Sequence, residues 1–108
     1  MSVRFWVTVL ASESLAPGTM TTIEHGDRRI AIFNVEGELY ATEDVKLQAF
    51  VYLTDGRIEG DVVVCPLDQG RFHIRSGRKL IPSAVDELKT YPVRVVDGNV
   101  EIELSSEP

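Results

Sequence analysis

The sequence has little of what disulfide-bonded and membrane proteins need. It holds one cysteine, Cys65, in 108 residues, so no disulfide can form within the chain and nothing points to an oxidising compartment. No stretch approaches the roughly 20 apolar residues of a membrane span. The first residues lack the apolar core and cleavage site of a signal peptide. We therefore expect a cytoplasmic protein that does not enter a membrane.

An excess of basic charge is also missing. The chain has 11 Lys and Arg against 17 Asp and Glu, a formal net charge of −6. This balance argues against nucleic acid or an anionic membrane as a partner, because both attract basic surfaces. It suits docking on a basic patch of another protein, although many ordinary proteins are as acidic. With 44% hydrophobic residues, the length suits one hydrophobic core, and we expect a single domain over residues 1–108.

Helical periodicity is scarce, whereas short segments rich in β-branched and aromatic residues recur between Gly and Pro. Single helical turns are predicted only at 12–15 and 84–88. Glu36-Gly37 and Asp97-Gly98 mark tight hairpins. The pattern predicts an all-β, small antiparallel sandwich or barrel. Its strands are expected at 5–10, 19–24, 29–35, 38–42, 61–64, 72–75, 93–96 and 99–104.

Catalytic patterns are missing as well. The sequence shows no Ser/His/Asp set, no Gly-rich phosphate loop and no paired carboxylates in a plausible cleft, so we expect no enzymatic activity of its own. Cys65 has no neighbouring histidine to activate it and is interpreted as a semi-buried thiol. Three pairs of adjacent charges are interpreted as solvated: Glu43-Asp44, Asp86-Glu87 and Arg28-Arg29.

One motif carries a family signature. Residues 65–72 read Cys-Pro-Leu-Asp-Gln-Gly-Arg-Phe, which resembles the second ligand loop of a Rieske iron–sulfur domain, where Cys-Pro-Leu-His is usual. Residues 31–42, 55–61, 76–80 and 88–93 match in the same order. From about residue 5 to 104 the chain is similar to the Rieske-type ferredoxins of bacterial aromatic-ring dioxygenases. The resemblance implies a Rieske-like β-sandwich or barrel with two loops at one tip that hold a [2Fe–2S] cluster for electron transfer.

The resemblance also places the ligand positions, and three of the four carry unsuitable residues. The family pattern C-x-H-x16-C-x2-H falls on Lys46, Gln48, Cys65 and Asp68. A lysine ammonium cannot donate to iron, and a glutamine amide is a weak substitute for imidazole. We therefore expect no cofactor and no metal, with a Lys46–Asp68 ion pair across the vacant site. Two alternatives remain: a redox centre with unusual ligation, or a zinc ion held by Cys65 and Asp68 with His73 or His25.

The first loop, residues 45–53, is unusually apolar for this family. Leu47, Phe50 and Val51 either fill the space of the cluster or face a partner; we expect filling, because an empty void is costly, although an alternating strand permits both. The predicted partner-binding residues are Leu47, Phe50, Tyr52 and Gln69.

These residues together lead to a functional hypothesis. The chain is interpreted as a cluster-less Rieske-fold protein that binds the oxygenase or reductase component of a dioxygenase-type electron-transfer system. One alternative is a Rieske-type electron-transfer ferredoxin with unusual ligation. The other is the small subunit of a nitrite-reductase-like enzyme, which in that family is similar to a Rieske domain without its ligands.

Overall fold

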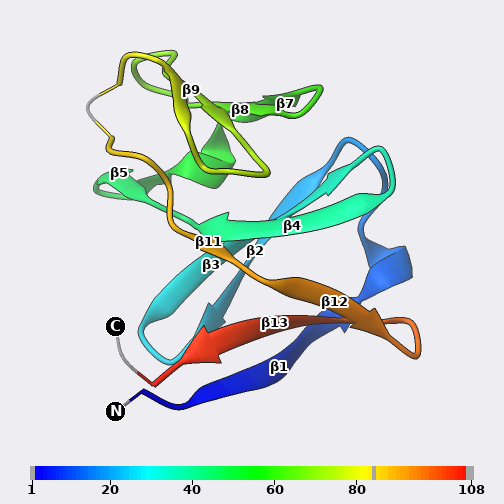
Figure 1. The fold of residues 1–108 in the computed structure, drawn as a ribbon. Coiled ribbons are helices and arrows are strands. Elements are labelled where there is room, and N and C mark those ends of the chain that lie inside the picture. Colours follow the sequence, from blue (N-terminus) through cyan, green and yellow to red (C-terminus); the bar gives the residue numbers. More distant parts are fainter. Residues whose placement is uncertain (1, 84, 107–108) are drawn as a thin grey trace.

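Antiparallel strands make up most of the chain in the computed structural model, which describes residues 2–83 and 85–106 (Figure 1). The strands are β1 (Arg4–Ala11), β2 (Met20–His25), β3 (Arg28–Val35), β4 (Glu38–Glu43), β5 (Lys46–Gln48), β6 (Val51–Tyr52), β7 (Arg57–Glu59), β8 (Val62–Val64), β9 (Arg71–His73), β10 (Lys79–Ile81), β11 (Thr90–Tyr91), β12 (Val93–Val96) and β13 (Asn99–Ser105). Two single 3-10 turns, η1 (Ser12–Ser14) and η2 (Leu53–Asp55), complete the described elements.

The strands form three main sheets and one small hairpin. Their orders are β1-β13-β12, β11-β4-β3-β2 and β10-β9-β8-β7, with β5 paired to β6. Figure 1 shows the sheet of β2, β3 and β4 lying between the β1-β13-β12 sheet and the end that carries β5 and β7 to β9. The middle sheet therefore has a neighbour on each side.

Strand β3 explains this layering, because its side chains alternate between two cores. Ile30 and Ile32 pack into one buried cluster with Ile102 and Leu104. Ala31 and Phe33 pack into the other cluster, with Leu53, Val63, Phe72 and Ile74 among its buried members. Each large apolar side chain removed from water contributes about 1.5–3 kcal/mol. A strand that is apolar on both faces thus holds the two halves together.

Two tight turns fix the register of the longer hairpins. Glu36 and Gly37 have φ angles of 53° and 94°, and Asp97 and Gly98 have 51° and 77°. Positive φ at both central residues is the backbone that matches the twist of a two-residue hairpin. The hairpins predicted at these positions are confirmed, with Val35 paired to Glu38 and Val96 to Asn99.

The predicted all-β class is confirmed, and each predicted strand overlaps an observed one. The helical turn predicted near residue 12 is present as η1. Of the turn predicted at 84–88, residue 84 lies outside the described residues, and the prediction is wrong for 85–88. These residues form no helical turn, and the Leu88 amide donates instead to Gly77 O at 2.8 Å. Across residues 2–83 and 85–106 no helix has the length and apolar character needed to cross a membrane.

Candidate functional site

Residues 45–53 form a short β-hairpin, the first of two loops at one end of the molecule. Lys46 pairs with Tyr52, and Gln48 pairs with Val51. Phe50 lies in the turn with a φ of 65°, a left-handed conformation that is unfavourable for a bulky side chain. The hairpin closes where the Leu53 amide donates to Val45 O at 2.8 Å. Its turn therefore projects Phe50 on a strained backbone.

The buried carboxylate of Asp44 anchors this hairpin. Its side chain is 0% exposed and forms an ion pair with Arg29 Nε at 2.8 Å. The carboxylate also accepts hydrogen bonds from the Thr54 amide at 3.0 Å and from Thr54 Oγ1 at 2.8 Å. Asp44 precedes the hairpin and Thr54 follows it. One carboxylate thus ties both ends of the loop to strand β3.

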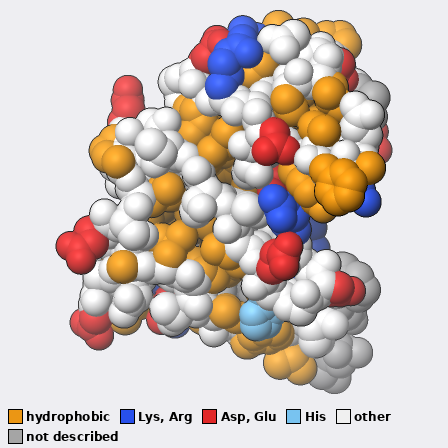
Figure 2. Space-filling view, turned by 180° about the vertical axis from the view of Figure 1, so that it is seen from behind, with side chains coloured by type: hydrophobic (Ala, Val, Ile, Leu, Met, Phe, Trp, Pro, Cys, Tyr) orange, Lys and Arg blue, Asp and Glu red, His pale blue; other side chains and the backbone are white. Residues whose placement is uncertain are grey.

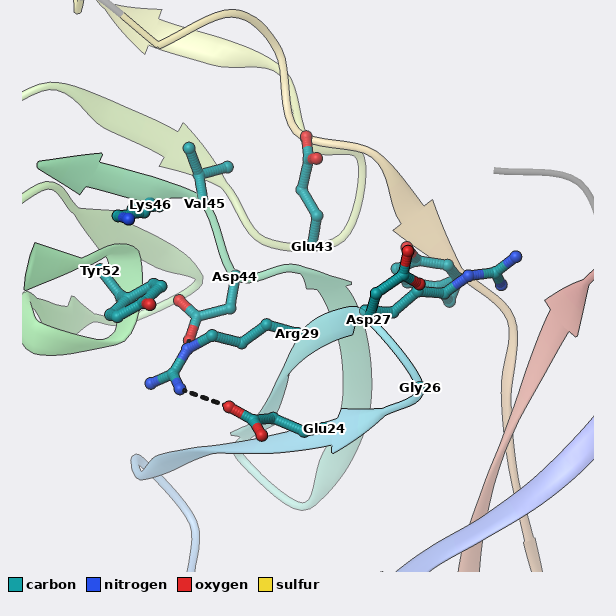
Figure 3. A pocket seen from close by; sticks show the side chains of 11 residues that line it. Glu24, Gly26, Asp27, Arg29, Glu43, Asp44, Val45, Lys46 and Tyr52 are labelled. Carbon is teal, nitrogen blue, oxygen red and sulfur yellow. Dashed lines mark hydrogen bonds and ion pairs between the residues drawn. The ribbon is translucent and has the colours of Figure 1, made fainter. Parts of the chain in front are cut away.

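The guanidinium of Arg29 completes the anchor. Figure 3 shows it between the Asp44 carboxylate and Glu24, beside the ring of Tyr52. Its carbon lies 3.8 Å from the centre of the Tyr52 ring, and its Nη1 lies 3.3 Å from Glu24 Oε1. A cation over an aromatic face is attractive, so Tyr52 braces the guanidinium as well as the hairpin. Tyr52 is accordingly half-buried.

Residues 65–70 form the second loop, which is closed by its own hydrogen bonds. The Cys65 amide donates to Gly70 O at 2.8 Å, and the Gly70 amide donates to Asp68 Oδ1 at 3.0 Å. Ser83 Oγ donates to Asp68 Oδ2 at 2.9 Å. A Cβ on Gly70 would lie 2.4 Å from Ser83 Cβ, so only glycine fits there. Asp68 therefore joins the second loop to residue 83 and does not extend freely from the tip.

Cys65 is fully buried beneath this loop. Its Sγ lies 4.0 Å from Ser83 Oγ. Burial raises the pKa of the Cys65 thiol, and the nearby Asp68 carboxylate raises it further against the opposing effect of the Ser83 contact. Burial disfavours the thiolate, the form that binds metals. The predicted semi-buried thiol is thus more deeply buried than expected.

The four predicted ligand positions are only partly brought together. Lys46 and Asp68 line one cavity of about 540 Å³ between the two loops. Among the described residues no ion pair joins them, so the predicted Lys46–Asp68 pair is wrong. The Asp68 oxygens instead accept from Ser83 and Gly70. Gln48 is exposed and Cys65 is buried behind the loop.

This donor set does not fit a [2Fe–2S] cluster. A Rieske centre needs two thiolates on one iron and two imidazoles on the other. These positions offer one buried thiol, an ammonium, an exposed amide and a hydrogen-bonded carboxylate. Nothing in the arrangement of these groups supplies the missing donors.

The zinc alternative is not supported either. Within residues 2–83 and 85–106, no group of three or more His, Cys, Asp or Glu side chains could hold a metal ion. His73 instead bonds Asp61 Oδ2 through Nε2 at 3.1 Å and Ser76 Oγ through Nδ1 at 3.0 Å. This Asp–His–Ser chain, which the sequence did not suggest, stabilises the turn after β9. His25 lies with its ring centre 6.3 Å from that of Phe5.

The expected filling of the tip by Phe50 is also wrong. Its side chain is 93% exposed and lies in the turn, where its φ is positive. Leu47 and Val51 are half-buried, whereas Leu67 in the second loop is 50% exposed and Gln69 is exposed. Figure 2 shows hydrophobic side chains reaching the surface at the end that carries β5 in Figure 1. Both loops thus present apolar surface to solvent.

Sequence reasoning missed Asp44, which it interpreted as a solvated charge. Asp44 continues the alternation of β4 by two positions from buried Thr42, and this was the one available signal. The partners Arg29 and Thr54 are distant in sequence, and only the fold brings them to the carboxylate. The same alternation places Glu43 and Val45 on the opposite side of the strand, as Figure 3 shows.

A small antiparallel β domain with two neighbouring loops at one end, one of them beginning Cys-Pro-Leu, has the architecture of a Rieske-type domain. The chain belongs to the family of Rieske-like [2Fe-2S] domains, which matches residues 5–103. The resemblance to Rieske-type ferredoxins is therefore confirmed. The family carries a cluster, whereas the residues at the positions predicted for its ligands do not suit one.

Similar proteins are ferredoxin components. The ferredoxin component of the naphthalene 1,2-dioxygenase system of Pseudomonas putida is 33% identical over 100 residues, covering 93% of this chain and 96% of that protein. A solved complex of oxygenase and ferredoxin in carbazole 1,9a-dioxygenase contains a chain with 30% identity and a TM-score of 0.81, covering 90% of this chain and 91% of that one.

A third similar protein comes from a different system. The structure assigned as a nitrite reductase NADPH small subunit is 28% identical, with a TM-score of 0.73. The match covers 91% of this chain and 97% of that one. The fold is thus shared by two kinds of redox assembly.

Proposed function

We propose that this chain is a cluster-less Rieske-type ferredoxin-like protein that binds another protein of a dioxygenase-type electron-transfer system. Its partner would be an oxygenase or a reductase component, engaged through the tip formed by residues 45–53 and 65–70. Residues 1–108 would act as one Rieske-like domain, and the cytoplasm stays the predicted location. The proposal assigns no catalytic step to the chain.

The second loop carries this proposal. Asp68 occupies the position predicted for a histidine ligand, and both of its oxygens accept hydrogen bonds within the protein. The first loop is held by Asp44 through Arg29 and Thr54. Because hydrogen bonds and one buried ion pair already fix both loops, the tip has no need of metal for its order. In a metal-bound domain, much of the free energy that orders such loops comes from the metal site.

The similar proteins support the choice of partner. The relatives are named as ferredoxin components of dioxygenase systems, and one structural neighbour comes from a complex of oxygenase and ferredoxin. We propose that Leu47, Phe50, Tyr52 and Gln69 contact the partner. Phe50 supports this best, since an aromatic side chain that is 93% exposed on a strained turn has no role in packing.

Analysis of iron and acid-labile sulfide in the purified protein tests the loss of the cluster. We expect a colourless protein with neither element, whose thermal unfolding is unchanged by a chelator. Stoichiometric iron and sulfide with visible absorbance would overturn the proposal and favour the alternative, an electron carrier with unusual ligation.

Partner binding needs a separate measurement. With the oxygenase of carbazole 1,9a-dioxygenase as the probe, biolayer interferometry should detect binding of the wild-type protein and at least tenfold weaker binding of Phe50→Asp. Val95→Asp is the matched control, because Val95 is an exposed apolar residue on β12, away from the tip. Equal loss in both variants, or no binding by the wild type, would contradict the proposal.

A nitrite reductase small subunit is the second candidate. It is favoured by the neighbour with a TM-score of 0.73, which is lower than the 0.81 of the ferredoxin complex. A nitrite reductase large subunit in the same binding assay separates the two candidates, and we expect it to bind more weakly than the oxygenase.

A further inference from the structure

The cavity between the two loops has apolar walls. Its four apolar lining residues are Val45 and Leu47 from the first loop, Leu67 from the second loop and Val85 from the segment that crosses the tip. Its volume of about 540 Å³ falls within the range of ligand pockets, about 300–1,000 Å³. Walls of this kind suit the hydrocarbon part of an incoming group.

The same cavity is strongly acidic. Glu43, Asp68, Asp86 and Glu87 line it, with Lys46 as its one lining cation, so its formal charge is −3. One oxygen of Glu43 accepts the Lys89 amide at 3.0 Å. A cavity with this excess of negative charge attracts a cationic group.

Two of these carboxylates are not used by the fold. Asp86 and Glu87 are exposed, and neither forms a hydrogen bond or ion pair with another described residue. Asp68, in contrast, is engaged by Ser83 and Gly70. Asp86 and Glu87 therefore line the cavity with negative charges that no described residue pairs. The exposed side chain of Leu67 lines the same cavity.

We propose that this cavity receives a lysine or arginine side chain of the docking protein. The aliphatic stem would lie against Leu47 and Leu67, and the cationic end would meet Asp86 and Glu87. Long basic side chains combine an apolar stem with a charged end in this way. The inference rests on the proposed docking function and adds the chemistry of the partner's contact. That contact would fill the space between the loops on binding.

A titration with pentylammonium, which reproduces a lysine side chain, tests the cavity directly. In ¹H–¹⁵N correlation spectra we expect saturable shifts of the amides of Leu47, Leu67 and Val85. Hexanoate, with the same pentyl chain and opposite charge, should produce none. Equal shifts with both probes would show that charge plays no part and would overturn the proposal.

Variants then test whether Asp86 and Glu87 supply the charge that binds the cation. Asp86→Asn combined with Glu87→Gln should weaken pentylammonium binding at least threefold. Glu13→Gln combined with Asp97→Asn is the control, since both residues are exposed and lie outside the cavity. If the cavity variant titrates like the wild type, the proposal is wrong.

Binding to the oxygenase separates this inference from the function on which it rests. We expect the cavity variant to bind the oxygenase at least fivefold more weakly than the wild type. If wild type and cavity variant bind equally well, the inference fails and the proposed function stands. If the wild type does not bind any oxygenase or reductase component, the proposed function fails. The cavity inference then fails as well, because it assumes such a partner.

Discussion

At the scale of single residues, Asp44 is the charge on which the tip depends. Its carboxylate is fully buried, and its three contacts come from Arg29 on β3 and from Thr54 beyond the hairpin. An unpaired buried charge is costly, so each partner stabilises the ion as well as the loop. The cation–π contact between Arg29 and Tyr52 brings the hairpin into the same network.

Replacing Asp44 by Ala is expected to lower the free energy of unfolding by about 2–4 kcal/mol, because it leaves Arg29 Nε and the Thr54 amide without their acceptor. Glu24→Gln is the matched control. It removes another carboxylate from the same guanidinium, but that carboxylate is exposed, and the expected loss is below about 1 kcal/mol. Urea denaturation measures both. Similar losses in the two variants would mean that the burial of Asp44 contributes nothing.

Cys65 determines how the free energy of unfolding changes at alkaline pH. Its pKa is raised in the folded protein, chiefly by burial, so the folded state holds the thiol proton more tightly than the unfolded state does. This contribution is complete below the ordinary pKa of a cysteine and is lost as the pH rises through the raised value. Relative to Cys65→Ala, the wild type should therefore lose stability on going from about pH 7 to about pH 10. Parallel stability curves for the two proteins would contradict this.

The sequence predicts these residues unequally. The family motif identifies Cys65 and Asp68, because ligand spacing is a local property of the chain. It cannot show that Asp68 bonds Ser83, fifteen positions further on, or that Asp44 is buried. Both facts depend on contacts that only the folded chain creates. The predicted ion pair failed for the same reason, since a spacing does not indicate which partner is nearer.

At the scale of secondary-structure elements, the β5–β6 hairpin combines a strained turn with an exposed aromatic side chain. Phe50 has a φ of 65° and contributes little to the core. An L-residue in the left-handed region costs roughly 1–2 kcal/mol, which glycine avoids. The backbone conformation at Phe50 therefore makes the β5–β6 hairpin less stable than it would be with glycine at this position.

Phe50→Gly should therefore be more stable than Phe50→Ala by about 1 kcal/mol, since both remove the side chain but only glycine relieves the backbone. At an ordinary negative φ the alanine variant would be the more stable one. The sign of the stability difference between the two variants therefore decides whether φ is positive. Thermal and urea unfolding of the two variants measure the difference. A more stable alanine variant would show that the turn is not left-handed in solution.

Element prediction succeeds where a strand is long enough to show a pattern. Strand β13 alternates over seven residues and β3 contains the apolar run 30–33, and both were predicted within one residue at each end. Strands β6 and β11 have two residues each, which is too short for any periodicity. Their conformation is imposed by the strands with which they pair.

At the scale of the whole molecule, the net charge of −6 should govern how quickly a partner is found. If the proposed partner presents basic side chains, raising the ionic strength from about 0.01 M to about 0.15 M shortens the Debye length from about 30 Å to about 8 Å. The association rate constant should then fall on the order of tenfold. Stopped-flow mixing with the oxygenase measures it. A rate constant insensitive to salt would argue against a basic partner.

The two attachments of the first loop have a consequence for diversification. Residues 46–52 are tied to the body of the protein by the Asp44–Thr54 contacts, the Val45–Leu53 hydrogen bond and the Tyr52–Arg29 contact. Between these points Gln48, Ala49 and Phe50 are exposed and therefore open to replacement. The hairpin can then be exchanged as a unit. A hairpin grafted from another member of the family, with Asp44, Tyr52 and Thr54 kept, would transfer recognition of that member's partner while the fold stays the same.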